Sequence, residues 1–242
     1  DDGASVLKWV FYILGIGILV ILFALIFPNY RAQPLKAKDE DDDFNFFLQL
    51  FIPKKGYLIT PVLIDLNILV VIILSLFGVN PFYPKTEDLI TFGALSSQIS
   101  NGEYWRFLSS MFLHGGIMHL LMNLMVLGIA GFICENIFGT VKFTIIYFLS
   151  GIIAGISSLL WHDGNVILVG ASGAIFGLIG SIAMALILRN NFKENKVALL
   201  IIVIYFVLNI FFGFISNSDN AAHISGFICG MLISLLFYAF ES

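Results

Sequence analysis

The chain has 242 residues, of which 59% are hydrophobic and 12% are charged, and its formal net charge is -4. A soluble domain of this length carries about 25% charged residues, so part of this protein's surface is expected to face lipid. No basic patch indicates nucleic-acid binding, and Cys134 and Cys229 lie in apolar runs without the spacing of a metal site or a redox pair.

Seven apolar segments are long enough, or nearly so, to cross a bilayer, which takes about 20 residues. They are 6–27, 60–78, 116–134, 141–161, 172–188, 197–215 and 221–240. The first segment is too long for the apolar part of a signal peptide, and no cleavage pattern follows it. The sequence therefore predicts an all-α polytopic membrane protein.

Two connections between the predicted spans are long. Residues 28–56 hold a mixed charge run and then the aromatic stretch FNFFLQLF, which favours a solvated linker that ends in an interfacial stretch. Residues 79–115 combine prolines, polar residues and a short apolar pattern. Because long loops are usually either functional or disordered, we expect an ordered cap that lies on the membrane here.

Basic residues are distributed unevenly between the two sides that the spans define. Leaving Lys8 aside, one side carries nine Lys and Arg residues and the other carries two. Connections that are rich in Lys and Arg usually lie in the cytoplasm. The side with nine basic residues is therefore predicted to be cytoplasmic, and its connections are 28–59, 135–142 and 189–196. The opposite connections are then outward, at 79–115, 162–171 and 216–220.

Polar side chains inside lipid are costly, so each one in a span is a candidate functional group. His119 and Asn123 stand near the start of the third predicted span, Ser172 opens the fifth and His223 opens the seventh. All three spans enter from the predicted outward face. We therefore expect these four side chains to share one shallow depth in the membrane.

The chemistry of these residues is complementary. Histidine is the usual base that takes the proton of serine near neutral pH, and a helix N-terminus favours the oxyanion that results. His119 and Asn123, four residues apart on one helical face, could donate hydrogen bonds to that oxyanion. Asp219 precedes His223 by four residues in a loop pattern, and a Ser–His dyad is favoured over a triad that includes Asp219.

Each of these residues also has a purely structural interpretation. A serine caps helices, and histidine and asparagine can join helices in lipid. Gly173 and Gly177, like Gly226 and Gly230, have the spacing of small residues that lets two membrane helices approach closely, but this spacing alone indicates packing only. GASGAIFG is not a G-x-S-x-G elbow, so no α/β-hydrolase is inferred.

In their order along the chain these motifs resemble the rhomboid intramembrane serine proteases, in a bacterial type with an additional N-terminal span. HGGIMHLLMN is similar to the family's second core helix, GASGAIFG to its fourth and AHISGFICG to its sixth. YWR at 104–106 resembles the Trp-Arg motif of the first loop, and ENIFG resembles the inner end of the second helix. The resemblance implies a six-helix core at 57–242, after an N-terminal transmembrane helix at 1–27 and a cytoplasmic linker at 28–56.

The resemblance also implies a role for each matching residue. Ser172 would be the nucleophile and His223 the general base, while His119 and Asn123 would form the oxyanion hole with the Ser172 backbone N–H. Phe176 stands where the family often has tyrosine, so stacking on the histidine is expected without the hydroxyl. The other supporting residues would be Trp105 and Arg106 in the outer loop, Glu135 joining helix ends, a structural His114, and the glycines Gly170, Gly173 and Gly226.

The expected function is cleavage of transmembrane or juxtamembrane segments near the outer face of the membrane, with no metal or organic cofactor. The partners would be the lipid bilayer and membrane proteins with unstable transmembrane segments, and no nucleic acid. The resemblance suggests the bacterial cytoplasmic (inner) membrane, with the active site opening to the extracytoplasmic side.

Two other functions fit the sequence less well. A catalytically inactive relative that binds transmembrane segments would usually lack the serine or the histidine, and both are present here. A transporter or channel would be expected to show charged residues in mid-span or broken helices in paired repeats. Asp65 is the nearest case, but it lies near the predicted cytoplasmic start of its span.

Overall fold

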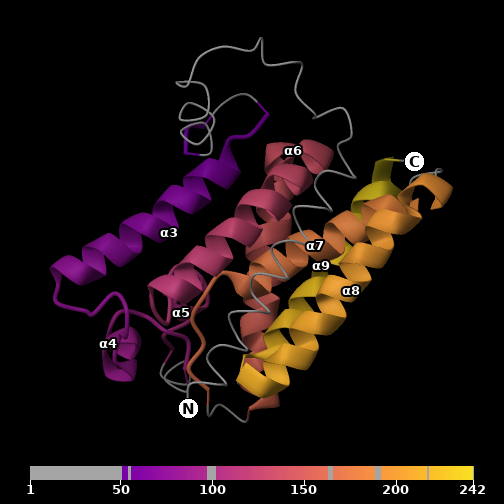
Figure 1. The fold of residues 1–242 in the computed structure, drawn as a ribbon. Helices are drawn as coiled ribbons and strands as arrows, with labels where there is room; N and C mark the ends of the chain where they lie inside the picture. The colour runs from indigo at the N-terminus through magenta and orange to yellow at the C-terminus, as the bar shows by residue number, and fades with distance from the viewer. Residues whose placement is uncertain are drawn as a thin grey trace, which may run out of the picture.

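A computed structural model of the chain describes residues 51–53, 56–96, 102–162, 166–188, 192–216 and 218–241. The predicted span at 6–27 and nearly all of the linker at 28–56 lie outside the described residues. The described chain is helical, as predicted (Figure 1). Its helices are α3 (Ile59–Leu76), α4 (Thr86–Thr91), α5 (Arg106–Ser109), α6 (Ile117–Trp161), α7 (Ser172–Leu188), α8 (Phe192–Ser216) and α9 (Asn220–Glu241).

Four of these helices, α3, α6, α8 and α9, are long and apolar enough to cross a membrane, and α7 is an apolar helix of 17 residues. Large apolar side chains on their outer faces are more than half exposed, including Ile72, Phe211 and Leu236. An apolar surface of this extent is suited to lipid rather than to water.

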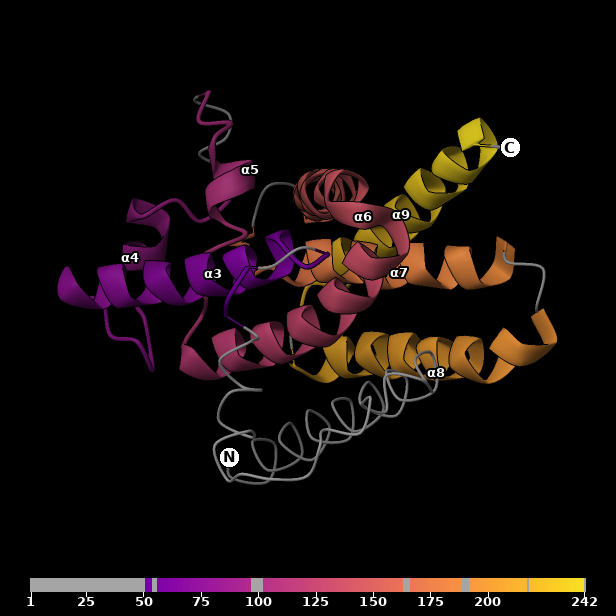
Figure 2. The same ribbon diagram turned by 90° about the horizontal axis from the view of Figure 1, so that it is seen from above.

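The predicted spans that fall within the described residues, from 60–78 onward, agree with the helix bounds, except that the third and fourth spans form one element. α6 has 45 residues and is interrupted only at Gly139, where φ is 75° and ψ is 166°. Glycine adopts positive φ without the steric cost that a side chain would bring. The expected connection around 135–141 is therefore a turn at a single residue, and Figure 2 shows the two parts of α6 running in different directions.

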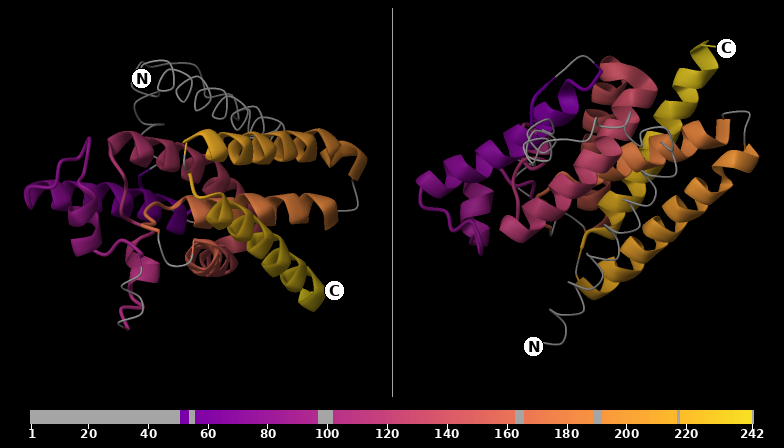
Figure 3. Two further views of the ribbon diagram at one scale, coloured as in Figure 1. Left: turned by 90° about the horizontal axis from the view of Figure 1, so that it is seen from below. Right: turned by 45° about the horizontal axis from the view of Figure 1, so that its top comes forward.

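α7 is the central helix of the described bundle and contacts α6, α8 and α9. Thirteen of its 17 residues are buried, as expected for a helix that is apolar on all sides. A Cβ atom added at Gly226 or at Gly230 in α9 would lie against the carbonyl of Gly173 or of Gly177 in α7. The predicted rows of small residues thus form the contact between α7 and α9, while the C-terminal end of α9 runs out past its neighbours (Figure 3).

The long loop after α3 is ordered in its described residues, as predicted. Its short helix α4 lies beside the end of α3, where a small apolar cluster, which includes Leu89 and Leu113, joins the loop to α3. The short helix α5 contacts α6. Leu95 and Leu168 form an antiparallel bridge, with N···O distances of 3.1 and 2.8 Å. This bridge connects the loop to the strand-like segment that leads into α7.

Candidate active site

Ser172 and His223 lie in hydrogen-bond contact. The Nε2 atom of His223 is 3.0 Å from the Oγ atom of Ser172, although the residues are 51 positions apart in the chain. Ser172 is the first residue of α7 and His223 lies in the first turn of α9, so the close packing of these helices brings the two side chains together. The distance is that of a hydrogen bond between a nucleophile and its base.

The second ring nitrogen of His223, Nδ1, is buried and has no hydrogen-bond partner among the described residues. The nearest candidate for a third catalytic residue, Asp219, directs its carboxylate elsewhere. Asp219 Oδ1 accepts a hydrogen bond of 2.9 Å from the Ala222 N–H, and Oδ2 accepts one from the Ser158 hydroxyl. The geometry is that of two residues rather than three.

Phe176, for which the family resemblance implies stacking, lies flat against the imidazole of His223. The ring centroids are 4.4 Å apart with an interplanar angle of 22°. Tyr205 of α8 stacks on Phe176 at 6.0 Å and 25°. Phe176 and Tyr205 are both buried, so the plane of the histidine ring is set by a packed aromatic stack.

His119 and Asn123, in the first turns of α6, lie against the backbone just before Ser172. A Cβ atom added at Gly170 would be 2.9 Å from His119 Nε2 and 3.5 Å from Asn123 Nδ2. Gly170 also has a φ of 115°, so both its space and its conformation require glycine. The structure therefore brings these two predicted donors to the start of α7.

The protonation of His119 follows from its hydrogen bond. Its Nδ1 atom accepts a hydrogen bond of 3.3 Å from the Gly115 N–H, so the neutral ring carries its proton on Nε2. Asn123 Nδ2 donates to the carbonyl of His119 at 3.0 Å, which holds the amide beside the ring. The Nε2–H group of His119 and the second N–H of the Asn123 amide can therefore donate hydrogen bonds to an oxyanion near Ser172.

His114 is buried beside His119, with ring centroids 5.2 Å apart at 71°. Its ring interacts with the backbone of Phe112, and neither ring nitrogen forms a hydrogen bond of full geometry within the described residues. Burial, together with the neighbouring His119, lowers the pKa of His114 from 6.5 to about 3. The ring is therefore neutral near physiological pH, and it packs behind the site rather than contacting Ser172.

Arg106 organises the outer loop. Its guanidinium is buried and donates to the carbonyls of Ile90 and Ala94 at 2.6 and 2.9 Å. Nε pairs with Glu103 at 2.5 Å, and the guanidinium carbon lies 4.7 Å from the centre of the Trp105 ring, which is half exposed. Both residues of the Trp-Arg motif thus hold α5 to the loop around Gly93 and take no part in the Ser172 contacts.

Glu135 is buried at the far end of the first part of α6 and joins it to the start of α3. Its carboxylate accepts hydrogen bonds from the backbone N–H groups of Leu58, Ile59 and Thr60 at 2.8 to 3.0 Å, and from the Thr60 hydroxyl at 2.8 Å. These N–H groups belong to the first turn of α3, where no intrahelical acceptor is available. Glu135 therefore lies where it joins two helix ends, which is the position that the resemblance implies.

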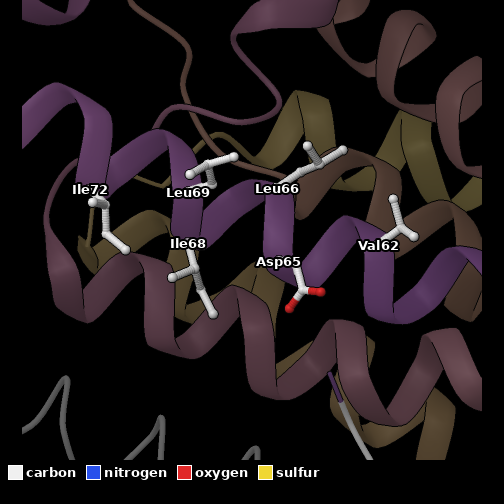
Figure 4. A pocket seen from close by; sticks show the side chains of 6 residues that line it. All are labelled: Val62, Asp65, Leu66, Ile68, Leu69 and Ile72. Atoms are coloured by element: carbon white, nitrogen blue, oxygen red, sulfur yellow. The ribbon is translucent and has the colours of Figure 1, made fainter. Parts of the chain in front are cut away.

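A pocket on α3 is separate from the predicted site residues. A pocket of about 390 Å³ on α3 contains Asp65 as its charged side chain and is otherwise lined by apolar residues, Val62, Leu66, Ile68, Leu69 and Ile72 (Figure 4). It includes none of the predicted site residues. Within the residues that the structure describes, no group of three or more His, Cys, Asp and Glu side chains could hold a metal ion.

Two residues near the site were missed by sequence reasoning. Tyr205 carries no motif and is one of many aromatic residues in the chain. Ser158, which bonds to Asp219, is a fully buried hydroxyl in a predicted span. The rule that polar groups inside lipid are candidates could have identified Ser158, but only the fold shows what it contacts.

Comparisons with known proteins agree with these features. Residues 101–240 match the family described as Rhomboid domain. RHOMBOID-like protein 5 of Arabidopsis thaliana is 36% identical over 156 residues, which are 63% of this chain and 50% of that protein. Rhomboid protease GluP of Bacillus subtilis (strain 168) is 37% identical over 162 residues, which are 66% of this chain and 31% of that protein.

A third relative carries a different name. Inactive RHOMBOID-like protein 8 of Arabidopsis thaliana is 39% identical over 153 residues, which are 62% of this chain and 43% of that protein. This chain thus spans half or less of the length of these three relatives. Since similar identities accompany the names of a protease and of an inactive protein, activity has to be argued from the site residues.

Proposed function

The chain belongs to the rhomboid family of integral membrane proteins, and we propose that it is an intramembrane serine endopeptidase that cleaves transmembrane or juxtamembrane segments of other membrane proteins. The observation that carries this proposal is the contact of 3.0 Å between Ser172 Oγ and His223 Nε2. A helix cap needs no histidine at its hydroxyl, whereas a serine nucleophile needs a base in that place.

In the proposed reaction, Ser172 Oγ attacks the scissile carbonyl carbon while His223 Nε2 takes the hydroxyl proton. The carbonyl oxygen becomes an oxyanion beside the donors on His119 Nε2, Asn123 Nδ2 and the Ser172 backbone N–H. The peptide C–N bond then breaks, and His223 gives its proton to the leaving amine. Water, activated by His223 in the same way, hydrolyses the acyl-enzyme and restores Ser172.

The substrate class follows from the chemistry of a peptide bond in a helix. Such a bond is hydrogen-bonded and shielded, so a substrate segment has to unwind before Ser172 can reach its carbonyl carbon. Segments with small or helix-destabilising residues near the cleaved bond would unwind most readily. The residues around Ser172 lie at the starts of α6, α7 and α9, so such a segment would be cut near one membrane surface.

The membrane arrangement is part of the proposal. The core at 57–242 would cross the membrane six times through α3, the two parts of α6, α7, α8 and α9, following an N-terminal span at 1–27 and a cytoplasmic linker at 28–56. The excess of Lys and Arg on the connections opposite the site supports an extracytoplasmic position for the site. The bacterial cytoplasmic membrane is the membrane that the motif type suggests.

Labelling with a fluorophosphonate serine probe in detergent tests this function. The wild-type chain is expected to label, and Ser172→Ala and His223→Ala to lose at least about 100-fold of the labelling rate. Ser181→Ala is the matched control, since Ser181 is a buried serine of the same helix whose hydroxyl donates to the Leu178 carbonyl. A wild type that does not label, or a Ser172→Ala variant that labels equally, contradicts the proposal.

The second candidate function is that of an inactive relative that binds transmembrane segments. The name of one 39% identical protein, which calls that protein inactive, is the reason to consider it. It predicts that a transmembrane peptide binds to the wild type and to Ser172→Ala alike while neither reacts with the probe. Labelling of the wild type at Ser172 excludes this alternative.

A further inference from the structure

Asp219 joins two helices that are distant in the sequence. It immediately precedes α9, and its Oδ1 atom accepts the Ala222 N–H at 2.9 Å. Its Oδ2 atom accepts the hydroxyl of Ser158, 61 residues earlier and close to the end of α6. Ser158 is fully buried, and only 11% of the Asp219 side chain is exposed. His162 Nε2 lies 3.7 Å from the same carboxylate at its outer edge.

Helix capping alone does not explain this arrangement. One oxygen atom is sufficient to cap a helix, and serine, threonine or asparagine would supply it as well as aspartate. The carboxylate has a second oxygen, and that oxygen bonds to α6. A hydrogen bond to a charged acceptor is stronger than one between neutral groups, and it is stronger again where water is excluded.

The position of His223 depends on the turn that Asp219 begins. The His223 N–H donates to the Asp219 carbonyl at 3.1 Å, so the two residues belong to one hydrogen-bonded turn. Within the described residues the ring has no hydrogen bond at Nδ1. The ring is instead placed by its backbone and by stacking on Phe176.

We propose that Asp219 is a positioning residue. The hydrogen bond that it accepts from Ser158 anchors the first turn of α9 to α6, and this anchor holds His223 Nε2 at hydrogen-bond distance from Ser172 Oγ. This inference rests on the proposed protease function, because it concerns the same dyad. It differs from a triad, since Asp219 acts through the backbone of α9 and does not touch the imidazole. A shift of about 1 Å between reacting groups is enough to lower a rate strongly.

The test compares variants that break the anchor with variants that keep it. Ser158→Ala removes the hydroxyl, and Asp219→Ser retains a capping oxygen but loses the reach to α6. Ser150→Ala is the control for α6, because Ser150 is an equally buried serine of the same helix and its hydroxyl is not a partner of the Asp219 carboxylate. Ser225→Ala is the control for α9, because Ser225 bonds to the carbonyl of Ala221 within its own helix.

Two measurements are made on each variant in detergent. Hydrogen–deuterium exchange of the peptide at 218–226 reports on the anchor without reference to catalysis. The rate of fluorophosphonate labelling at saturating probe reports on the dyad. Ser158→Ala and Asp219→Ser are each expected to speed exchange and to slow labelling by about tenfold, with no further change in the double variant, because both remove one shared bond. Both controls are expected to stay within about twofold of the wild type.

Four results separate the possibilities. The inference is overturned if both anchor variants exchange and label at the same rates as their controls. It is also overturned if the effects of the two substitutions are fully additive in the double variant. Faster exchange with unchanged labelling would reduce Asp219 to a stabilising residue and would also overturn it. If the wild type does not label but exchange in the anchor variants still rises, the proposed protease function fails while the anchoring of α9 is supported. Should Ser158→Ala not fold, Asp219→Ser carries the same comparison.

Discussion

Ser172 Oγ and His223 Nε2 lie 3.0 Å apart because the helices that carry them touch through their backbones. At the crossing of α7 and α9 the Gly173 carbonyl fills the space that a side chain at Gly226 would need, and Gly177 stands in the same relation to Gly230. The serine–base contact is therefore formed without any rearrangement. The geometry of this contact therefore depends on glycines, which have no polar side chain.

Gly226→Ala is expected to separate the two helices. The added methyl carbon would lie 3.0 Å from the carbonyl carbon of Gly173 and closer still to its oxygen, and neither backbone atom can move aside by a rotamer change. We expect unfolding to become easier by about 1–3 kcal/mol, and fluorophosphonate labelling to fall with it. Thermal unfolding in detergent and the labelling rate measure the two effects.

Gly128→Ala is the control for this variant. Gly128 lies inside α6, and a Cβ atom there would have no atom within 4 Å outside its own helix. The substitution is expected to be neutral or to stabilise the helix by up to about 1 kcal/mol. Equal effects of the two substitutions would mean that close helix contact does not govern the site.

Phe176→Leu is expected to release the histidine ring from the aromatic stack. The labelling rate should fall roughly threefold to tenfold, corresponding to the 0.5–1.5 kcal/mol of an aromatic pair. Phe176→Tyr keeps the ring and should lose less. Phe143→Leu is the control, because Phe143 is fully buried and stacks on Tyr147 instead. A larger loss of labelling in Phe143→Leu than in Phe176→Leu would contradict a role for the stack.

Asn123→Ala removes a proposed oxyanion donor. Loss of such a donor lowers the rate of the chemical step by roughly 100-fold or more, and labelling at saturating probe should fall accordingly. Asn67→Ala is the matched control. Asn67 is a buried asparagine of α3 that donates to the carbonyl four residues earlier, as Asn123 does in α6. Comparable slowing in both variants would point to a loss of packing rather than of an oxyanion contact.

Glu135→Gln tests the joint between α6 and α3. Glutamine offers one acceptor oxygen where the carboxylate offers two, so donors among Leu58, Ile59 and Thr60 are left unpaired in a buried place. We expect the free energy of unfolding to fall by about 2–3 kcal/mol. Glu87→Gln, at an exposed glutamate in the first turn of α4, should change it by less than about 0.5 kcal/mol. Thermal unfolding in detergent compares them, and equal shifts would show that the bonds at α3 are dispensable.

The sequence predicted the helices more completely than their connections. Apolar runs defined α3, α7, α8 and α9 because a spanning helix needs about 20 apolar residues, and this requirement overrides weaker local signals. A connection was predicted at 135–141, but its shortness was not, because one glycine at positive φ, Gly139, takes the place of a loop. The contacts of Ser172 and His223 followed from their shared position at helix starts.

Other features of the site depend on which helices become neighbours. The bond between Ser158 and Asp219 joins residues 61 positions apart, and neither residue stands in a pattern that refers to the other. Stacking of Tyr205 on Phe176 likewise needs α8 beside α7. Such contacts are properties of tertiary packing, and periodicity within a single segment carries no information about them.

His114 provides a prediction about pH. In the folded protein its pKa is lowered to about 3 by burial and by His119, whereas the unfolded chain has the ordinary value of 6.5. Between these values the unfolded chain binds more protons, so this histidine makes the folded state less stable as the pH falls from 6.5 toward 3. His114→Gln cannot take up a proton in this range. Its melting temperature in detergent should therefore fall less than that of the wild type between about pH 7.5 and pH 5.

His162→Gln is the control, since His162 is a partly exposed histidine at the end of α6. An equal pH dependence in the wild type and in His114→Gln would mean that His114 is not a buried, neutral ring in the folded protein.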